Sequence, residues 1–329
     1  MMFDRAYRQR LEADLARWEV EGVTTPAVVA AIRATLLPLV AGTTIAEVVA
    51  IVGGLLIAAA FLAFVAAHWM ELARLLRFAV LLAGILAAHG LGAWFARKGR
   101  PLLADLCVSG GAIIFGAGIA LVGQMYHLGE DFSGGMLLWS IGALASAALT
   151  GSRGALAVAL AAASTWTTMH AFEARNVLHI PFAVFWLAAA CLAIAWNSRV
   201  AAHLVAVASL PWWFSAALES GGNEQLFVLA NGAALLLGSG LALGEASLPR
   251  ISGFGSVCSS YGAFLLAGCS AAGVSFELFR MTGGGVGQPP WAIACGVAGV
   301  IFATVAAATT RRAGPIYRVA RSVLSCSRP

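Results

Sequence analysis

The stretch LLADLCVSGGAIIFGAGIALVG, Leu102–Gly123, holds 22 residues and one charged side chain, Asp105. A transmembrane helix needs about 20 mostly apolar residues, because the hydrocarbon core that it must cross is about 30 Å thick. Every backbone polar group must be hydrogen-bonded within such a segment, so a helix is the conformation expected for it. The stretch therefore predicts a membrane-spanning helix and an all-α fold class.

Nine further segments resemble this one in length and composition, and together they predict a bundle of about ten spans. The chain is 60% hydrophobic and 11% charged over its 329 residues, whereas a soluble domain carries about 25% charged residues. Ser133–Thr150 and Gly154–Phe172 are short and rich in alanine, so a re-entrant hairpin is an alternative for this pair. The predicted spans are Thr44–Ala67, Leu75–Ala96, Leu102–Gly123, Ser133–Thr150, Gly154–Phe172, His179–Asn197, Val200–Leu218, Gln225–Gly244, Phe254–Ser275 and Pro290–Thr310.

Basic side chains are distributed unevenly between the two sides of these spans. With ten spans and a cytoplasmic N-terminus, 16 of the 20 basic residues fall on the cytoplasmic side. Loops rich in arginine and lysine remain in the cytoplasm. We therefore expect a multi-pass protein of the inner (plasma) membrane with both termini cytoplasmic. We also expect no cleaved signal peptide, because no early apolar stretch is followed by a cleavage site.

The ends of the chain are predicted to lie outside the bilayer. Residues 1–40 predict a cytosolic helical hairpin, residues 41–310 the transmembrane bundle, and residues 311–329 a basic cytosolic tail. In the hairpin, Thr25 and Pro26 are typical of a helix start. The faces expected to pack on each other carry apolar residues at helical spacing: Leu11, Leu15 and Trp18 in the first helix, and Val28, Ile32 and Leu36 in the second.

Glycines predict where the helices approach each other closely. Five of them lie between Gly110 and Gly123, and Gly240 and Gly244 are separated by three residues. Small residues let two helix backbones come into van der Waals contact, which replaces the missing hydrophobic drive in lipid.

Polar residues gather directly after Gly123, on the side opposite the arginines. Imidazole and carboxylate groups of this kind can bind a small ligand, relay a proton or hold a metal. The alternative is an interfacial belt of aromatic and solvated side chains. The spacing is not a zinc signature, so no metal site is assigned. The candidate ligand-binding residues on this side are His68, Trp69, Gln124, Tyr126, His127, Glu130 and Asp131.

Polar residues inside the predicted spans include His89, Asn231 and Asp105. His89 and Asn231 are the intramembrane candidates, because ionisable and polar groups within a bilayer are often functional. The alternative for His89 is a neutral imidazole bonded to a backbone carbonyl. Asp105 lies near the cytoplasmic boundary, where a basic residue at 97–100 is expected to neutralise it.

Enzyme and nucleic-acid signatures are missing from the sequence. There is no G-x-S-x-G, H-E-x-x-H or Walker motif, and no C-x-x-C pair. We predict no enzyme, no cofactor and no nucleic-acid partner, with the lipid bilayer and a small-molecule ligand as candidate partners and protein partners unknown. The hypotheses are small-solute or proton-coupled binding and transport, or a non-transporting envelope sensor or scaffold that acts through the hairpin. A third alternative is a membrane-embedded hydrolase, which would require a bound metal.

Three segments of the N-terminal half carry a resemblance to a known family. They are RWEVEGVTTPAVVAAI (17–32), AAHWMEL (66–72) and GAIIFGAGIALVGQMYHLGEDF (111–132). Over about residues 5–145 the chain resembles the bacterial predicted membrane proteins grouped as domain of unknown function 2157. The family commonly has Asn where this chain has His68, so a role of the Asn side-chain amide does not carry over to this chain. The resemblance implies a membrane location and a helical fold, without an activity.

Overall fold

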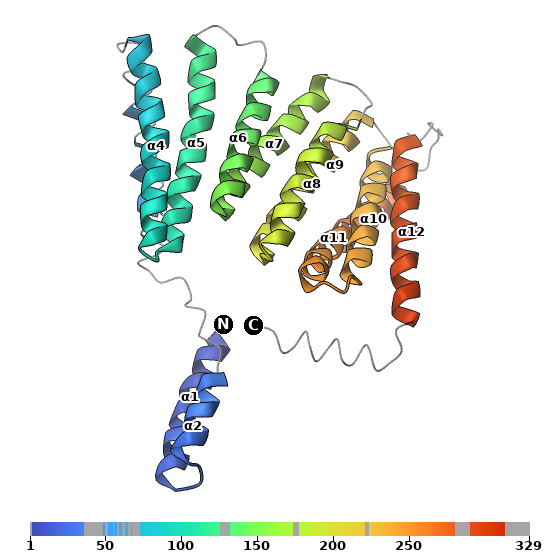
Figure 1. The fold of residues 1–329 in the computed structure, drawn as a ribbon. Coiled ribbons are helices and arrows are strands. Elements are labelled where there is room, and N and C mark those ends of the chain that lie inside the picture. Colours follow the sequence, from blue (N-terminus) through green and yellow to red (C-terminus); the bar gives the residue numbers. More distant parts are fainter. Residues whose placement is uncertain are drawn as a thin grey trace. The chain divides into compact units, whose positions relative to one another are not determined.

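The computed structural model describes residues 2–35, 73–125, 132–173, 178–220, 224–279 and 290–312, with scattered positions between 49 and 67. Regular structure in these residues is helical, without a strand. The chain divides into two compact units, Met1–Gly53 with Ile316–Pro329, and Gly54–Pro315. The helices labelled in Figure 1 are α1 (Met2–Val20), α2 (Pro26–Thr35), α4 (Arg74–Arg97), α5 (Pro101–Met125), α6 (Phe132–Thr150), α7 (Arg153–Glu173), α8 (Ile180–Ala195), α9 (Arg199–Ser220), α10 (Glu224–Gly244), α11 (Pro249–Phe279) and α12 (Pro290–Arg312).

The first unit contains α1 and α2, the two helices predicted before the membrane. Gly22 follows α1 with a φ of 71°, a left-handed conformation that glycine adopts without steric cost. The N–H of Val23 then donates to the carbonyl of Trp18 at 2.9 Å, which closes the end of the helix. Leu15 of α1 and Val29 of α2 are buried, whereas Val28 is 47% exposed. The prediction for α2 is therefore wrong at Val28, whereas Ile32 is half-buried and Leu36 lies outside the described residues. The cytosolic location stays a prediction.

In the second unit a helix occupies each of the nine predicted segments from Leu75–Ala96 onward. The segment Thr44–Ala67 falls largely outside the described residues. Seven helices, α4, α5, α6, α9, α10, α11 and α12, are long and apolar enough to cross a membrane. α8 is apolar but has 16 residues, and α7 carries Thr167, Thr168 and His170 in its second half. The total of about ten spans stays a prediction.

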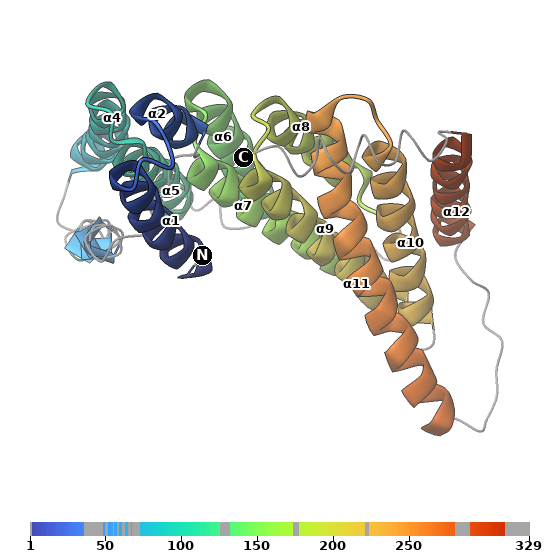
Figure 2. The ribbon, with the colours of Figure 1, turned by 90° about the horizontal axis from the view of Figure 1, so that it is seen from below.

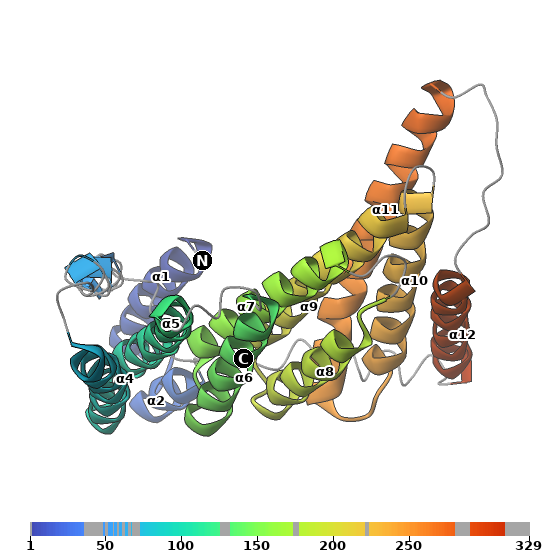
Figure 3. The ribbon, with the colours of Figure 1, turned by 90° about the horizontal axis from the view of Figure 1, so that it is seen from above.

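Successive helices of this unit pack on one another in chain order. α4 packs on α5, α5 on α6 and α7, and α7 on α8 and α9. α9 in turn contacts α10 and α11, and Figures 2 and 3 show α10 with α11 on one side and α12 on the other. A large core of small side chains and a few aromatic rings joins α5 through α11.

Glycines bring α10 into backbone contact with both of its neighbours. A Cβ on Gly240 would lie 2.8 Å from the carbonyl oxygen of Gly255 in α11. A Cβ on Gly238 would overlap the carbonyl oxygen of Gly299 in α12. The predicted contact at Gly240 is thus confirmed. Such approach gives the van der Waals contact that stabilises helix pairs in lipid.

Asp105 of α5 binds the first turn of α7. The N–H of Gly154 donates to both of its carboxylate oxygens, at 3.2 and 3.3 Å. Ser152 caps the same turn through a bond from the Ala155 N–H at 3.0 Å. The expected pairing with residues 97–100 is not found among the described side chains. A carboxylate is stabilised at a helix N-terminus, where unpaired N–H groups carry partial positive charge, so it needs no basic partner.

We expect Asp105→Ala to lower the free energy of unfolding by about 1 kcal/mol, because the α7 N-terminus loses an acceptor and a favourable charge. Thermal unfolding of the purified protein in detergent measures this. Asp105→Asn keeps an acceptor and should lose less, and Asp14→Ala, which removes an exposed ion pair within α1, is the control. Equal stability of Asp105→Ala and wild type would show that the contact contributes nothing.

Candidate functional site

Most of the predicted ligand-binding residues lie outside the described part of the chain. His68, Trp69, Tyr126, His127, Glu130 and Asp131 belong to this group. Gln124 is described, and it is exposed in the last turn of α5, one residue before that helix ends. The predicted cluster therefore stays a prediction, and among its members Gln124 is the one that the structure describes.

Two histidines meet at that same end of the bundle. His170 lies in the last turn of α7, and His179 precedes α8. Their rings are stacked, with centroids 4.1 Å apart and planes 25° from parallel. Because consecutive helices alternate in direction, the ends of α5 and α7 and the start of α8 fall on one side of the unit (Figure 1). The turns that carry Arg100, Arg153 and Arg199 fall on the other.

His179 is held tightly from the α7 side. The residue is 8% exposed, and its Nδ1 lies 3.1 Å from the hydroxyl of buried Thr167. The edge of the ring meets Trp166, with centroids 4.3 Å apart. In the predicted topology, the end of Gly154–Phe172 and the start of His179–Asn197 lie on the same side of the membrane. The structure brings the two histidine rings there into contact.

The His170–His179 pair disfavours a proton on His179. Burial, and then the charge of His170, lower the pKa of His179 from 6.5 to about 4. An unfolded chain would bind a proton there below about pH 6.5, whereas the folded protein binds it only near pH 4. The stability that the neutral ring contributes is thus present above pH 6.5 and is lost as the pH falls toward 4.

We expect His170→Asn to raise the pKa of His179 toward its ordinary value, because the neighbouring positive charge is removed. The fall in melting temperature between pH 7 and pH 4.5 should then be smaller than in wild type. Differential scanning at a series of pH values measures it, with His203→Asn, an exposed histidine of α9, as the control. An unchanged pH dependence in His170→Asn would show that the two rings do not interact.

The intramembrane candidates are both bonded within the bundle. The Nδ1 of His89 in α4 lies 2.9 Å from the carbonyl oxygen of Ile85. Its Nε2 lies 2.9 Å from the hydroxyl oxygen of Ser146 in α6. The Asn231 amide donates to the carbonyl of Phe227 at 2.8 Å, and its oxygen lies where a Cβ on Gly296 of α12 would be. Asn231 therefore joins α10 to α12, whereas His89 is bonded to a hydroxyl of another helix.

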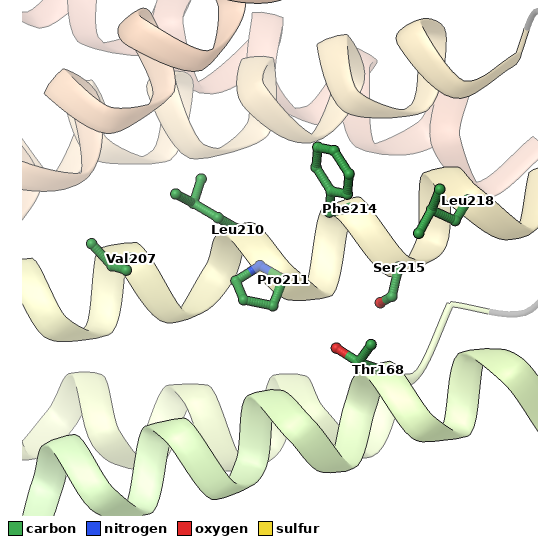
Figure 4. A pocket seen from close by; sticks show the side chains of 7 residues that line it. All are labelled: Thr168, Val207, Leu210, Pro211, Phe214, Ser215 and Leu218. Carbon is green, nitrogen blue, oxygen red and sulfur yellow. The ribbon is translucent and has the colours of Figure 1, made fainter.

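An apolar groove lies between α7 and α9, and Figure 4 shows its lining. Its cavity volume is about 400 Å³. The hydroxyls of Thr168 and Ser215 bond to carbonyls of their own helices, at 2.8 and 2.9 Å, so the wall offers little polarity. Among the described residues, no group of three or more His, Cys, Asp or Glu is placed to hold a metal ion.

The described residues form helices without a strand, and seven of these helices have membrane-spanning length and composition. The chain is therefore a multi-pass membrane protein. Residues 16–156 match the family described as "Predicted membrane protein (DUF2157)", which confirms the predicted resemblance over that part of the chain. No curated protein and no solved structure matches the chain.

Proposed function

We propose that the protein carries a small polar solute, or protons, across the membrane. The binding site is at the end of the helices opposite the arginine-bearing turns. The stacked pair of His170 and His179 is the observation that supports this most. Titratable side chains that are buried or in contact with each other are found most often at functional sites. These two histidine rings are such a pair. At neutral pH the His179 ring is neutral and its nitrogens can exchange hydrogen bonds or a proton.

The predicted polar cluster would complete this site. Gln124 lies in the last turn of α5, on the same side as the two histidines. His127, Glu130 and Asp131 follow it in sequence. Imidazole and carboxylate groups together could pass a proton or neutralise a cationic solute as it enters the bundle. On this proposal the arginine-bearing end is cytoplasmic, and the site opens on the far side of the inner membrane.

Flux across liposomes tests the proposal. Purified protein is reconstituted with a pH-sensitive dye or a panel of labelled small solutes trapped inside, and uptake is followed after a gradient is imposed. We expect uptake above that of protein-free liposomes, with His179→Asn, His127→Ala and Glu130→Ala reduced toward that background. His203→Asn should retain wild-type flux. Background flux in the wild type, for protons and for every solute tried, would contradict the proposal.

A second candidate function is a non-transporting sensor or scaffold that acts through its N-terminal helices. Residues Met1–Gly53 form a compact unit with the C-terminal residues, separate from the rest of the chain. α1 carries exposed charged groups, including the Asp14–Arg17 pair at 2.8 Å. Crosslinking in cells, with and without residues 1–40, tests this function. Partners captured only by the full chain would support it, and an identical set of partners would contradict it.

A further inference from the structure

His89 and Ser146 form a hydrogen-bonded pair that joins two helices distant in sequence. The Nε2–Oγ distance is 2.9 Å across a separation of 57 residues. α4 and α6 each pack on α5 rather than extensively on one another, so this bond bridges the two helices over α5. Gly111 of α5 makes room for it, because a Cβ there would lie 2.6 Å from the His89 Nδ1.

The bonds of His89 define its tautomer. The Ile85 carbonyl can only accept a hydrogen bond, so the Nδ1 that lies 2.9 Å from it carries the proton. In the neutral ring Nε2 is then the unprotonated nitrogen, and the Ser146 hydroxyl must donate to it. A serine that donates to an imidazole whose other nitrogen is fixed by an acceptor has the arrangement of an activated nucleophile and its base.

The depth of the pair in the membrane indicates a class of substrate. Ser146 lies one turn before α6 ends at Thr150, which is about 6 Å along the helix axis. α6 has 19 residues, about 28 Å, close to the thickness of the hydrocarbon core. Ser146 therefore lies just inside the boundary at which membrane lipids carry their ester bonds, and both side chains are partly exposed.

We propose that Ser146 is a nucleophile, with His89 as its general base, toward carboxylic esters that enter from the arginine-bearing face of the membrane. This is a different activity at the opposite end of the bundle from the His170–His179 pair. It therefore does not depend on the proposed transport, and the two proposals can fail separately.

The chemistry needs only an ester and water. The Ser146 oxygen attacks the carbonyl carbon while its proton passes to the His89 Nε2. The bond to the leaving alcohol breaks, and that oxygen takes the proton from His89, which leaves an acyl group on Ser146. Water then attacks the acyl-enzyme, again losing a proton to His89, and the Ser146 oxygen leaves and regains that proton as the carboxylic acid departs.

A fluorophosphonate probe tests the pair directly. The Ser146 oxygen would displace fluoride from phosphorus, and the modified peptide is located by mass spectrometry of the full-length protein in detergent. We expect modification at Ser146, none at position 146 in Ser146→Ala, and a rate about 100-fold lower in His89→Gln, which can still bond to Ser146 but cannot act as a base. Ser239→Ala, which removes a hydroxyl bonded to its own helix at 2.7 Å, should label like wild type.

Two further measurements, the first of them on the wild type, keep the test independent of how well a variant folds. The labelling rate should increase with pH through one protonation step, as expected for a base that must be neutral. Melting curves of all variants check that each is folded. Absence of label on Ser146 in the wild type, or equally fast labelling of a folded His89→Gln, would overturn the proposal.

Discussion

Replacing Gly255 of α11 by leucine is expected to separate α10 from α11 and to lower the free energy of unfolding by about 3 kcal/mol or more. A Cβ at this position would lie 2.6 Å from the carbonyl oxygen of Gly240 and 2.7 Å from the carbonyl carbon of Leu243. Both are backbone atoms and cannot rotate away, so the helices themselves must move. Thermal unfolding in detergent, with retention on size exclusion, measures the effect.

The same helix provides the control. Gly268 has nothing within 4 Å of the position that a Cβ would take, so Gly268→Leu adds the same side chain without a clash. Leucine also favours a helix over glycine by a few tenths of a kcal/mol up to about 1 kcal/mol, and this variant should be as stable as wild type or slightly more so. Equal melting temperatures of the two variants would contradict the close contact of α10 with α11.

Phe182→Ala should be the other strongly destabilising change, at about 3–5 kcal/mol. Phe182 is fully buried at the start of α8, and its ring centroid lies 5.4 Å from that of Trp212 in α9. Truncation leaves a void and removes many small dispersion contacts at once. His179 is one turn away, so the stacked histidines should also loosen.

Comparison with Phe264→Ala isolates the effect of packing. Phe264 of α11 is 82% exposed within the described structure, and its loss should change stability by no more than about 0.5 kcal/mol. The two variants remove the same atoms, so unequal melting temperatures report burial rather than composition. A Phe182→Ala protein as stable as Phe264→Ala would contradict the described core.

Helix positions could be predicted from the sequence because lipid imposes a simple rule on backbone polar groups. The stretch Leu102–Gly123 became α5, Pro101–Met125, with ends shifted by at most two residues. The side chains by which one helix faces its partner were harder to predict. In α2, Val29 is buried and Val28 is exposed. A one-residue change turns a helical side chain by about 100°, and apolar residues on several faces of α2 give little basis for choosing among them.

The polar contacts depended on tertiary structure that no local pattern contains. His89 could be singled out because it is ionisable within a span, but Ser146 is one of many helical serines and lies 57 residues away. Asp105 was assigned to the nearest basic residues in sequence, whereas folding presented the start of α7 to it. The cluster predicted after Gly123 lies mostly beyond the described residues, so it stays a prediction.

If α8 crosses the bilayer as the sequence predicts, its length has a consequence for the lipid around it. Its 16 residues extend about 24 Å, which is several ångströms less than the hydrocarbon thickness of an average bilayer. A segment too short for its surroundings draws the headgroups inward or dimples the leaflet beside it. Such a dimple at the start of α8 would bring water to the imidazoles of His170 and His179. In a thicker synthetic membrane the free-energy cost of bringing water to these rings should be larger.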